Sequence, residues 1–193
     1  MKLVLDIETD GLDPTCIHVA VCKNIESGET TSFREWDKVF FQSYLNKADQ
    51  VIMHNGISFD LPILERLWGI SFPYTKVLDT LVISQLHNPI RDGGNGLQNW
   101  GNILGFPKDE KPVSFKEFTT QMHNYCVRDV EVTEKVYHKL RSDMKGWSKR
   151  SVDLEHTVRR LMDLQTQHGF FIDQQKVHTL VASLSDESGE LED

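Results

Sequence analysis

The order of apolar segments in this 193-residue sequence predicts an α/β domain with a mixed β-sheet flanked by helices. Three strand-like segments come first, at residues 2–7, 17–22 and 30–33, and turn-forming residues separate them. From residue 36 onward, strand-like and helical segments alternate, which is typical of strands joined by helices. A helical extension follows the mixed sheet near the C-terminus.

Each later element has a local reason in the sequence. Ser58 is a suitable N-cap for a helix that Gly69 ends, and Gly105 ends a second helix. The loop at residues 88–96 contains a proline and three glycines. Apolar spacing predicts, in order, a helix at 36–45, a strand at 51–53, helices at 58–69, 79–86, 97–104 and 114–144, a linker at 145–150, a helix at 153–168, a short strand at 170–172 and a last helix capped by Asp173.

Composition and charge narrow the class of protein. The formal net charge of -8 argues against a broad basic surface that would hold nucleic acid by electrostatics alone. Cys16, Cys22 and Cys126 show no metal-binding spacing, so they are expected to be free thiols in a reducing compartment. No apolar run approaches the roughly 20 residues that cross a bilayer. We therefore expect a cytoplasmic protein without a membrane partner.

Carboxylates stand where burial alone would not place them. Asp6 and Glu8 are two apart at the end of the first strand, so they share one face of it. Asp60 follows the strand at 51–53, and Tyr125 and Asp129 lie one turn apart on the long helix. The four acids are expected to converge near the carboxyl ends of strands, where α/β sheets place their sites.

Clustered carboxylates repel one another unless cations lie among them, and hard oxygen ligands suit Mg²⁺ or Mn²⁺. Two such ions can clamp the attacking and leaving oxygens of a phosphoryl displacement. The hydroxyl of Tyr125 can orient the attacking water, and it remains mostly protonated at neutral pH because an ordinary phenol has a pKa near 10. Taken singly, each acid has a structural explanation, such as a solvated face or a favourable charge at a helix start. Their combination favours a catalytic site.

Three short motifs carry a family resemblance. Asp-x-Glu in LDIET, Asn-x-x-x-Phe-Asp in NGISFD and Tyr-x-x-x-Asp in YCVRD resemble the exonuclease motifs of the DEDD superfamily of 3′–5′ exonucleases. Tyr125 indicates the tyrosine branch, because Asn124 stands where the histidine branch has its histidine. The chain is most similar to the proofreading domain of family-A DNA polymerases of the bacteriophage replicative type, and LDTLVISQL and GLQNWGNILG support this resemblance.

The resemblance implies a ribonuclease-H-like fold and a metal-dependent exonuclease that removes nucleoside monophosphates from single-stranded DNA 3′ ends. Asp6, Glu8, Asp60 and Asp129 would then bind two Mg²⁺ or Mn²⁺ ions, and Tyr125 would orient the water. The resemblance also implies substrate contacts, which would be made by Thr9, Leu12, Asn55 and Phe59.

Domain organisation follows from the same resemblance. Residues 1–147 are expected to form the exonuclease domain, and residues 148–193 a linker and the incomplete start of a polymerase domain. The partner would be a polymerase domain, in cis or in trans, and a phage source would place the chain in the host cytoplasm. Two alternatives remain open: a ribonuclease D-like RNA 3′ exonuclease, and a non-catalytic module that docks on a polymerase or binds nucleic acid.

Overall fold

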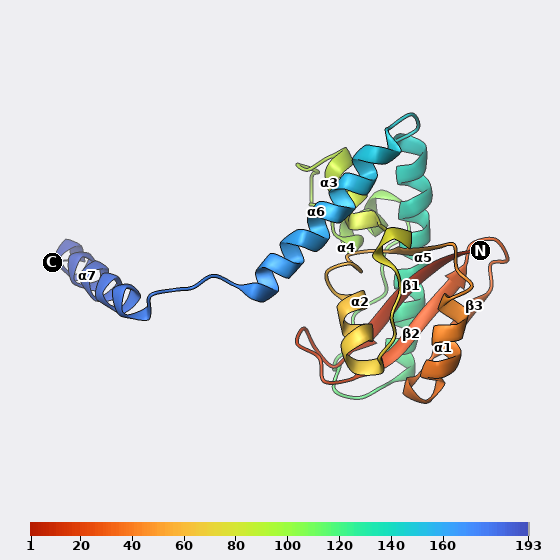
Figure 1. Ribbon diagram of the computed structural model, residues 1–193, viewed down its shortest axis with the longest axis horizontal. Coiled ribbons are helices and arrows are strands. Elements are labelled where there is room, and N and C mark those ends of the chain that lie inside the picture. The colour runs from red at the N-terminus through yellow and green to blue at the C-terminus, as the bar shows by residue number, and fades with distance from the viewer. Residues whose placement is uncertain (193) are drawn as a thin grey trace. The chain divides into compact units, whose positions relative to one another are not determined.

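The computed structural model describes residues 1–192 and contains a five-stranded mixed sheet (Figure 1). The strands lie in the order β3-β2-β1-β4-β5. β1 is antiparallel to β2, and β2 is antiparallel to β3, whereas β4 is parallel to both β1 and β5. The strand bounds are β1 Lys2–Thr9, β2 Ile17–Asn24, β3 Thr30–Phe33, β4 Gln50–Met53 and β5 Val77–Asp79. The predicted mixed sheet is confirmed, and β1 is its central strand.

Helices make up most of the remaining elements. Short 3-10 turns occur at η1 Glu35–Asp37 and η3 Tyr74–Lys76, and a π-helical turn at η2 Leu64–Trp68. The α-helices are α1 Lys38–Leu45, α2 Asp60–Ile63, α3 Thr80–His87, α4 Leu97–Ile103, α5 Thr120–Asp143, α6 Lys149–His168 and α7 Gln174–Glu192. The longest of them, α5, packs across β1, β2 and β4.

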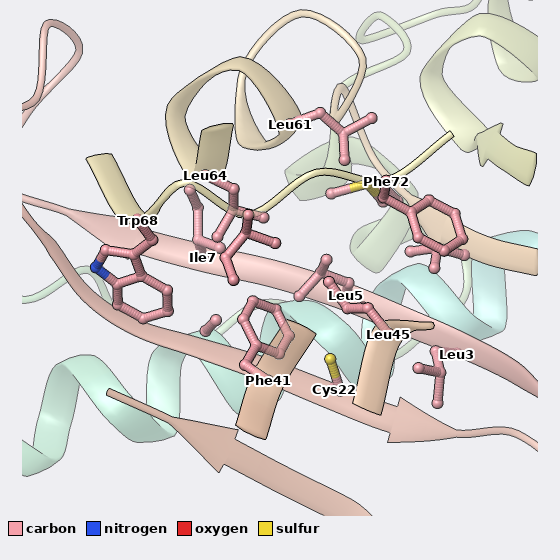
Figure 2. Packing of buried hydrophobic residues seen from close by; sticks show 14 of the residues in the cluster. Leu3, Leu5, Ile7, Cys22, Phe41, Leu45, Leu61, Leu64, Trp68 and Phe72 are labelled. Carbon is pink, nitrogen blue, oxygen red and sulfur yellow. The ribbon is translucent and has the colours of Figure 1, made fainter. Parts of the chain in front are cut away.

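One face of the sheet is covered by α1 and α2 (Figure 2). Leu3, Leu5 and Ile7 of β1 point to this side and pack with Phe41 and Leu45 of α1. Their side chains are at most 5% exposed. Because alternate residues of a strand share a face, every second position of β1 contributes to this core.

The opposite face of β1 packs against α5. Val4 lies in a smaller core with Ile52 of β4 and with Cys126 and Val130 of α5. This core does not continue to the carboxyl end of β1, because Asp6 and Glu8 occupy the next two positions on the same face of the strand as Val4. The apolar contact between β1 and α5 therefore gives way to acids at the carboxyl end of the strand.

Several predicted elements differ from the structure. The N-cap of α2 is Phe59 and not Ser58, and no side-chain hydrogen bond caps the helix. In α1, Phe41 and Leu45 form the buried face, whereas Val39 and Phe40 are 78% and 69% exposed. The long helix begins at Thr120, where Thr119 caps it, and not at residue 114.

One strand was missed by the sequence analysis, and one predicted strand was wrong. β5 was not predicted as a strand, because its three residues are too short to show a period. Residues 170–172 form no strand, since a strand requires a hydrogen-bonded neighbour and none of the described strands pairs with them. Asp173 does cap the last helix, because its carboxylate accepts a 3.1 Å hydrogen bond from the backbone N–H of Lys176.

The chain divides into two compact units, residues 1–161 and residues 162–193. The sheet, the helices α1–α5 and the first part of α6 belong to the first unit, which contains all candidate site residues. The predicted end of the exonuclease domain after residue 147 remains a prediction. Among the described residues, no helix is long and apolar enough to cross a membrane.

Candidate active site

The first part of the site is the carboxyl end of β1. Asp6 and Glu8 continue the face of the strand that Val4 begins, so both carboxylates point toward α5. Glu8 is only 7% exposed although it is an acid. Antiparallel pairing with β2 holds this end of β1 in place, with Asp6 opposite Val21 and Glu8 opposite Val19. The two carboxylates therefore stand on a fixed strand and not on a loop.

Asp60 reaches the same place from β4. The parallel pairing of β1 and β4 extends only to Val4 and Ile52, so the two strands part beyond that point. Asp60, in the first turn of α2, enters the opening, and its Oδ1 accepts a 3.2 Å hydrogen bond from the backbone N–H of Ile7. This contact fixes Asp60 between the positions of Asp6 and Glu8.

The third part of the site comes from α5. Tyr125 and Asp129 are each 5% exposed and lie one turn apart on the helix. Between them, the Cys126 thiol donates to Oδ2 of Asp6 at 3.4 Å and lies 3.6 Å from the Asp6 carbonyl oxygen. One ligand atom from each of Asp6, Glu8 and Cys126 lies within 4.8 Å of the others. The structure thus brings together residues 120 positions apart.

The carboxylates disfavour one another electrostatically. Burial, together with the charges of Asp60 and Asp129, raises the pKa of Asp6 well above its usual value. Burial, followed by repulsion from Asp6, raises the pKa of Glu8 to about 9. Burial, followed by the Asp79 charge, raises the pKa of Asp60 to about 8. Without cations, the site therefore favours bound protons at neutral pH.

Lys108 supplies a positive charge inside this acidic site. Its Nζ lies 2.5 Å from Oδ2 of Asp129, and the two side chains are only 13% and 7% exposed. Burial raises the pKa of Asp129 to about 6, even though the Lys108 ammonium acts to lower it. The same ammonium lies 4.6 Å from the centre of the Tyr125 ring. Lys108 is therefore part of the site, next to Asp129 and Tyr125 of α5.

The residues fit divalent cations. Asp6, Glu8, Asp60 and Asp129 offer carboxylate oxygens, which are the donors that Mg²⁺ and Mn²⁺ prefer. Oδ1 of Asp129 is buried and accepts no hydrogen bond from the described residues, so this acid retains an unused ligand atom. A cation at these oxygens would offset the repulsion among the carboxylates. The four acids would hold it.

The residues expected to contact substrate are Thr9, Leu12, Asn55 and Phe59. Leu12 is 93% exposed in the loop after β1, and Thr9 ends β1, where its hydroxyl donates to the carbonyl of Gly11 at 2.8 Å. Asn55 adopts the left-handed backbone region with a φ of 66°. Phe59 is partly buried and packs on the core beneath the site. Their contacts with substrate remain predictions.

Asp79 organises the turn that carries Asn55, although the sequence showed no such role. Its carboxylate accepts hydrogen bonds from the backbone N–H groups of Asn55, Ile57 and Leu81 at 2.9, 3.1 and 2.9 Å. It therefore caps α3 and fixes the turn after β4 at the same time. The adjacent His54 has a pKa lowered to about 4 by burial, so it is neutral, as expected for a buried structural histidine.

Sequence reasoning missed Lys108, Cys126 and the role of Asp79. Lys108 lies in the charged run KDEK, which is typical of a solvated loop. Cys126 directly follows Tyr125, and its position could have been inferred from the face that Val130 shares with it. The sequence LDTL, with an acid before a helix, was the available signal for Asp79 as a cap.

Comparison with known proteins defines the class. The family model of the RNase H superfamily matches residues 3–141, and the chain belongs to this superfamily. The predicted ribonuclease-H-like fold is thereby confirmed.

Sequence relatives are more specific. The DNA-directed DNA polymerases of Enterobacteria phage T3 and Escherichia phage T7 are 28% and 27% identical to this chain, over 98% of its length. The alignments cover 36% of each polymerase, so the chain spans about a third of the length of these relatives. The resemblance to a bacteriophage DNA polymerase is confirmed.

Solved structures share the fold at low identity. NrnC of Brucella melitensis bound to pGG has a TM-score of 0.67 and 18% identity, and 89% of each chain is covered. The catalytic core of RRP6 from Trypanosoma brucei has a TM-score of 0.62 and 12% identity, with 85% of this chain and 46% of that chain covered. These similarities show the fold.

Proposed function

We propose that the chain is a metal-dependent 3′–5′ exonuclease domain that removes nucleoside monophosphates from single-stranded DNA 3′ ends. The observation that carries the proposal is the meeting of Asp6, Glu8, Asp60 and Asp129 around the carboxyl end of β1, with Tyr125 beside them. Several carboxylates clustered in a largely buried site lower the stability of the fold unless bound cations offset their charge. The similarity to phage polymerases supports DNA as the substrate and proofreading as the role.

The proposed reaction is hydrolysis of the terminal phosphodiester. When bound, divalent cations would offset the carboxylate charges and stabilise the negative charge on both the attacking and the leaving oxygen. A water oxygen attacks phosphorus, the bond from phosphorus to the 3′ oxygen breaks, and that oxygen leaves with a proton. The products are a nucleoside 5′-monophosphate and a strand with a new 3′ hydroxyl.

Tyr125 orients the water in this scheme. Burial raises the pKa of its phenol above the usual value of 10, so the hydroxyl keeps its proton at neutral pH. A protonated hydroxyl donates a hydrogen bond and does not abstract a proton. Its role is therefore to position the attacking water relative to Asp129, one turn along α5.

Leu12 and Asn55 support the choice of a strand end as the substrate. Leu12 is exposed in the loop that leaves β1, four residues after Glu8, and offers an apolar surface to a terminal base. Asn55 is held by Asp79 at the start of the turn that leads to Asp60. Leu12 follows Glu8 and Asn55 precedes Asp60 in the chain, which supports contact of both residues with a short single strand that enters the site.

A single assay tests this function. A 5′-labelled DNA oligonucleotide incubated with Mg²⁺ is expected to give a ladder that shortens from the 3′ end, and the ladder should vanish in EDTA. A matched RNA oligonucleotide identifies the substrate, and faster cleavage of RNA would support the ribonuclease D-like alternative. If neither nucleic acid is degraded while divalent ions bind normally, the chain is a non-catalytic module and the proposal is wrong.

A further inference from the structure

We propose that Lys108 is a catalytic residue whose ammonium contacts the scissile phosphate, an inference that rests on the proposed exonuclease function. The motifs that identified the acids do not include this lysine. It reaches the site from the connector between α4 and α5, defined here as residues 104–119. Its position relative to Asp129 and Tyr125 is the starting observation.

A lysine that is 13% exposed is unusual, because lysine usually keeps its charge in water. Here the charge lies between Asp129, at 2.5 Å, and the ring of Tyr125, at 4.6 Å. The ammonium therefore stands next to both the acid and the phenol assigned to the reaction. A solvated loop lysine would not need this burial.

The connector is held in place on its first side by close backbone packing. Gly101 of α4 lies directly beneath it: a Cβ at Gly101 would come within 3.0 Å of the Phe106 carbonyl oxygen and 3.3 Å of the Lys108 nitrogen. The Phe106 N–H also donates to the carbonyl of Gly101 at 2.9 Å. A larger residue at position 101 would push the backbone of Lys108 away from α4.

α5 holds the connector from the other side. The guanidinium of Arg128 donates to the Pro107 carbonyl at 2.9 Å and stacks 3.3 Å from the centre of the Phe106 ring. Arg128 immediately precedes Asp129, so the same turn of helix positions both the acid and the backbone that carries Lys108. The placement of Lys108 is thus built by the fold and does not depend on its ion pair alone.

The far end of the connector is anchored as well. The Nε2 atom of His18 in β2 lies 2.8 Å from the Phe115 carbonyl oxygen. The Phe115 ring meets the Tyr125 ring edge-on, with centroids 6.5 Å apart. Arg34 stacks over Phe118 at 3.6 Å. These contacts limit how far Lys108 can retreat when other charges enter the site.

Charge then decides the role of the lysine. Cations at Asp129 would compete with the ammonium for the same carboxylate, so Lys108 would release Asp129 while its backbone stays fixed. The ammonium would then face the incoming phosphate, whose non-bridging oxygens gain negative charge as water attacks. A fixed ammonium directed at developing charge accelerates such a step.

The experiment compares Lys108→Met with Lys116→Met, which removes an exposed lysine from the same connector. At saturating Mg²⁺ and oligonucleotide, we expect Lys108→Met to lower kcat by about 10²-fold. In calorimetric titrations without substrate, it should bind Mg²⁺ or Mn²⁺ more tightly than the wild type, since no ammonium pairs with Asp129. Lys108→Arg should recover part of kcat, and Lys116→Met should match the wild type in both measurements.

Other outcomes overturn the proposal. Tighter metal binding with an unchanged or higher kcat would make Lys108 a displaceable plug of the metal site, and no change in either measurement would make it a bystander. Should Lys108→Met fail to fold, Lys108→Arg and Lys108→Gln replace it as a pair, and equal kcat values for the two would refute a role for the charge. Wild-type protein that degrades no nucleic acid would instead refute the proposed function itself.

Discussion

The two faces of β1 make opposite contributions to stability. On one face, Leu5 and Ile7 are buried in an apolar core that closes against α1 and α2 (Figure 2). On the other face, Asp6 and Glu8 are directed at α5 and at each other, and burial raises the pKa values of both. One strand therefore combines residues that stabilise the fold with residues that oppose it.

The apolar face of β1 explains why the acids stand on this strand and not on a loop. The apolar face fixes the strand with a free energy of burial of roughly 25 cal/mol for each Å² of apolar surface. That stability allows the opposite face to hold several carboxylates at close range. Substitutions on the two faces should therefore have separable effects, one on activity and the other on folding.

The largest expected effect comes from the acidic face. Asp6→Ala removes the acid whose carboxylate interacts electrostatically with both Asp60 and Asp129, so the hydrolysis rate should fall on the order of 10³-fold or more. The rate is measured with the 5′-labelled oligonucleotide at saturating Mg²⁺. Asp92→Ala, at an exposed position of the loop after α3, is the control and should keep wild-type activity. Activity that survives Asp6→Ala would show that the metal site lies elsewhere.

The next effect concerns the apolar face. Leu5→Ala creates a cavity beside Phe41 and Leu45, and we expect the free energy of unfolding to fall by about 2–5 kcal/mol. Denaturant unfolding measures this loss, and the rate per folded molecule should stay near the wild-type value. Leu12→Ala makes the same chemical change at a side chain that is 93% exposed, so it should leave the stability unchanged. Equal losses for the two leucines would refute the division of the faces.

Tyr125→Phe should have a smaller effect on activity than Asp6→Ala. Removing the hydroxyl leaves the ring packed against Phe115 but takes away the donor that orients the water. We expect kcat to fall by about 10²-fold with little change in metal binding. Kinetics at saturating Mg²⁺, combined with calorimetry, separates the two quantities. A weakened metal affinity with an unchanged kcat would contradict the positioning role.

The smallest effect is a pH dependence of stability in protein stripped of divalent ions. Raised pKa values mean that the folded state keeps protons which the unfolded state has already released, so the free energy of unfolding should fall as pH rises from about 4 to about 9. Thermal unfolding in EDTA across this range measures the slope. Glu8→Gln should flatten it, whereas Glu29→Gln, at an exposed position, should not. A slope of opposite sign would show that the acids are not buried together.

Much of the fold could be predicted because turn-forming residues separate the first strand-like segments. β1 could be located from the apolar run that precedes Asp6, and the acids at its carboxyl end could be grouped with Asp60 and Asp129 by their motifs. β5 could not be predicted, since its three residues owe their state to pairing with β4. The strand expected at 170–172 failed for the converse reason: strand-forming residues without a paired neighbour do not form a strand.

The site was predicted as far as its motifs reach. Lys108 could not be predicted, because only the packing of the connector over Gly101 and against Arg128 brings a residue of a charged run into the interior. Asp79 likewise gains its role from tertiary contact, since it accepts hydrogen bonds from a turn more than 20 positions earlier in the chain. Positions that depend on long-range contacts have no local signature in the sequence.

The central claim is that the acids of β1, α2 and α5 form one site for divalent cations. Calorimetric titration of Mn²⁺ into ion-free protein tests it most directly, with Asp6→Asn as the matched variant. We expect the wild type to bind two ions and Asp6→Asn, which keeps the size of the side chain, to lose this binding. Identical isotherms for the two proteins, or no binding to the wild type, would contradict it.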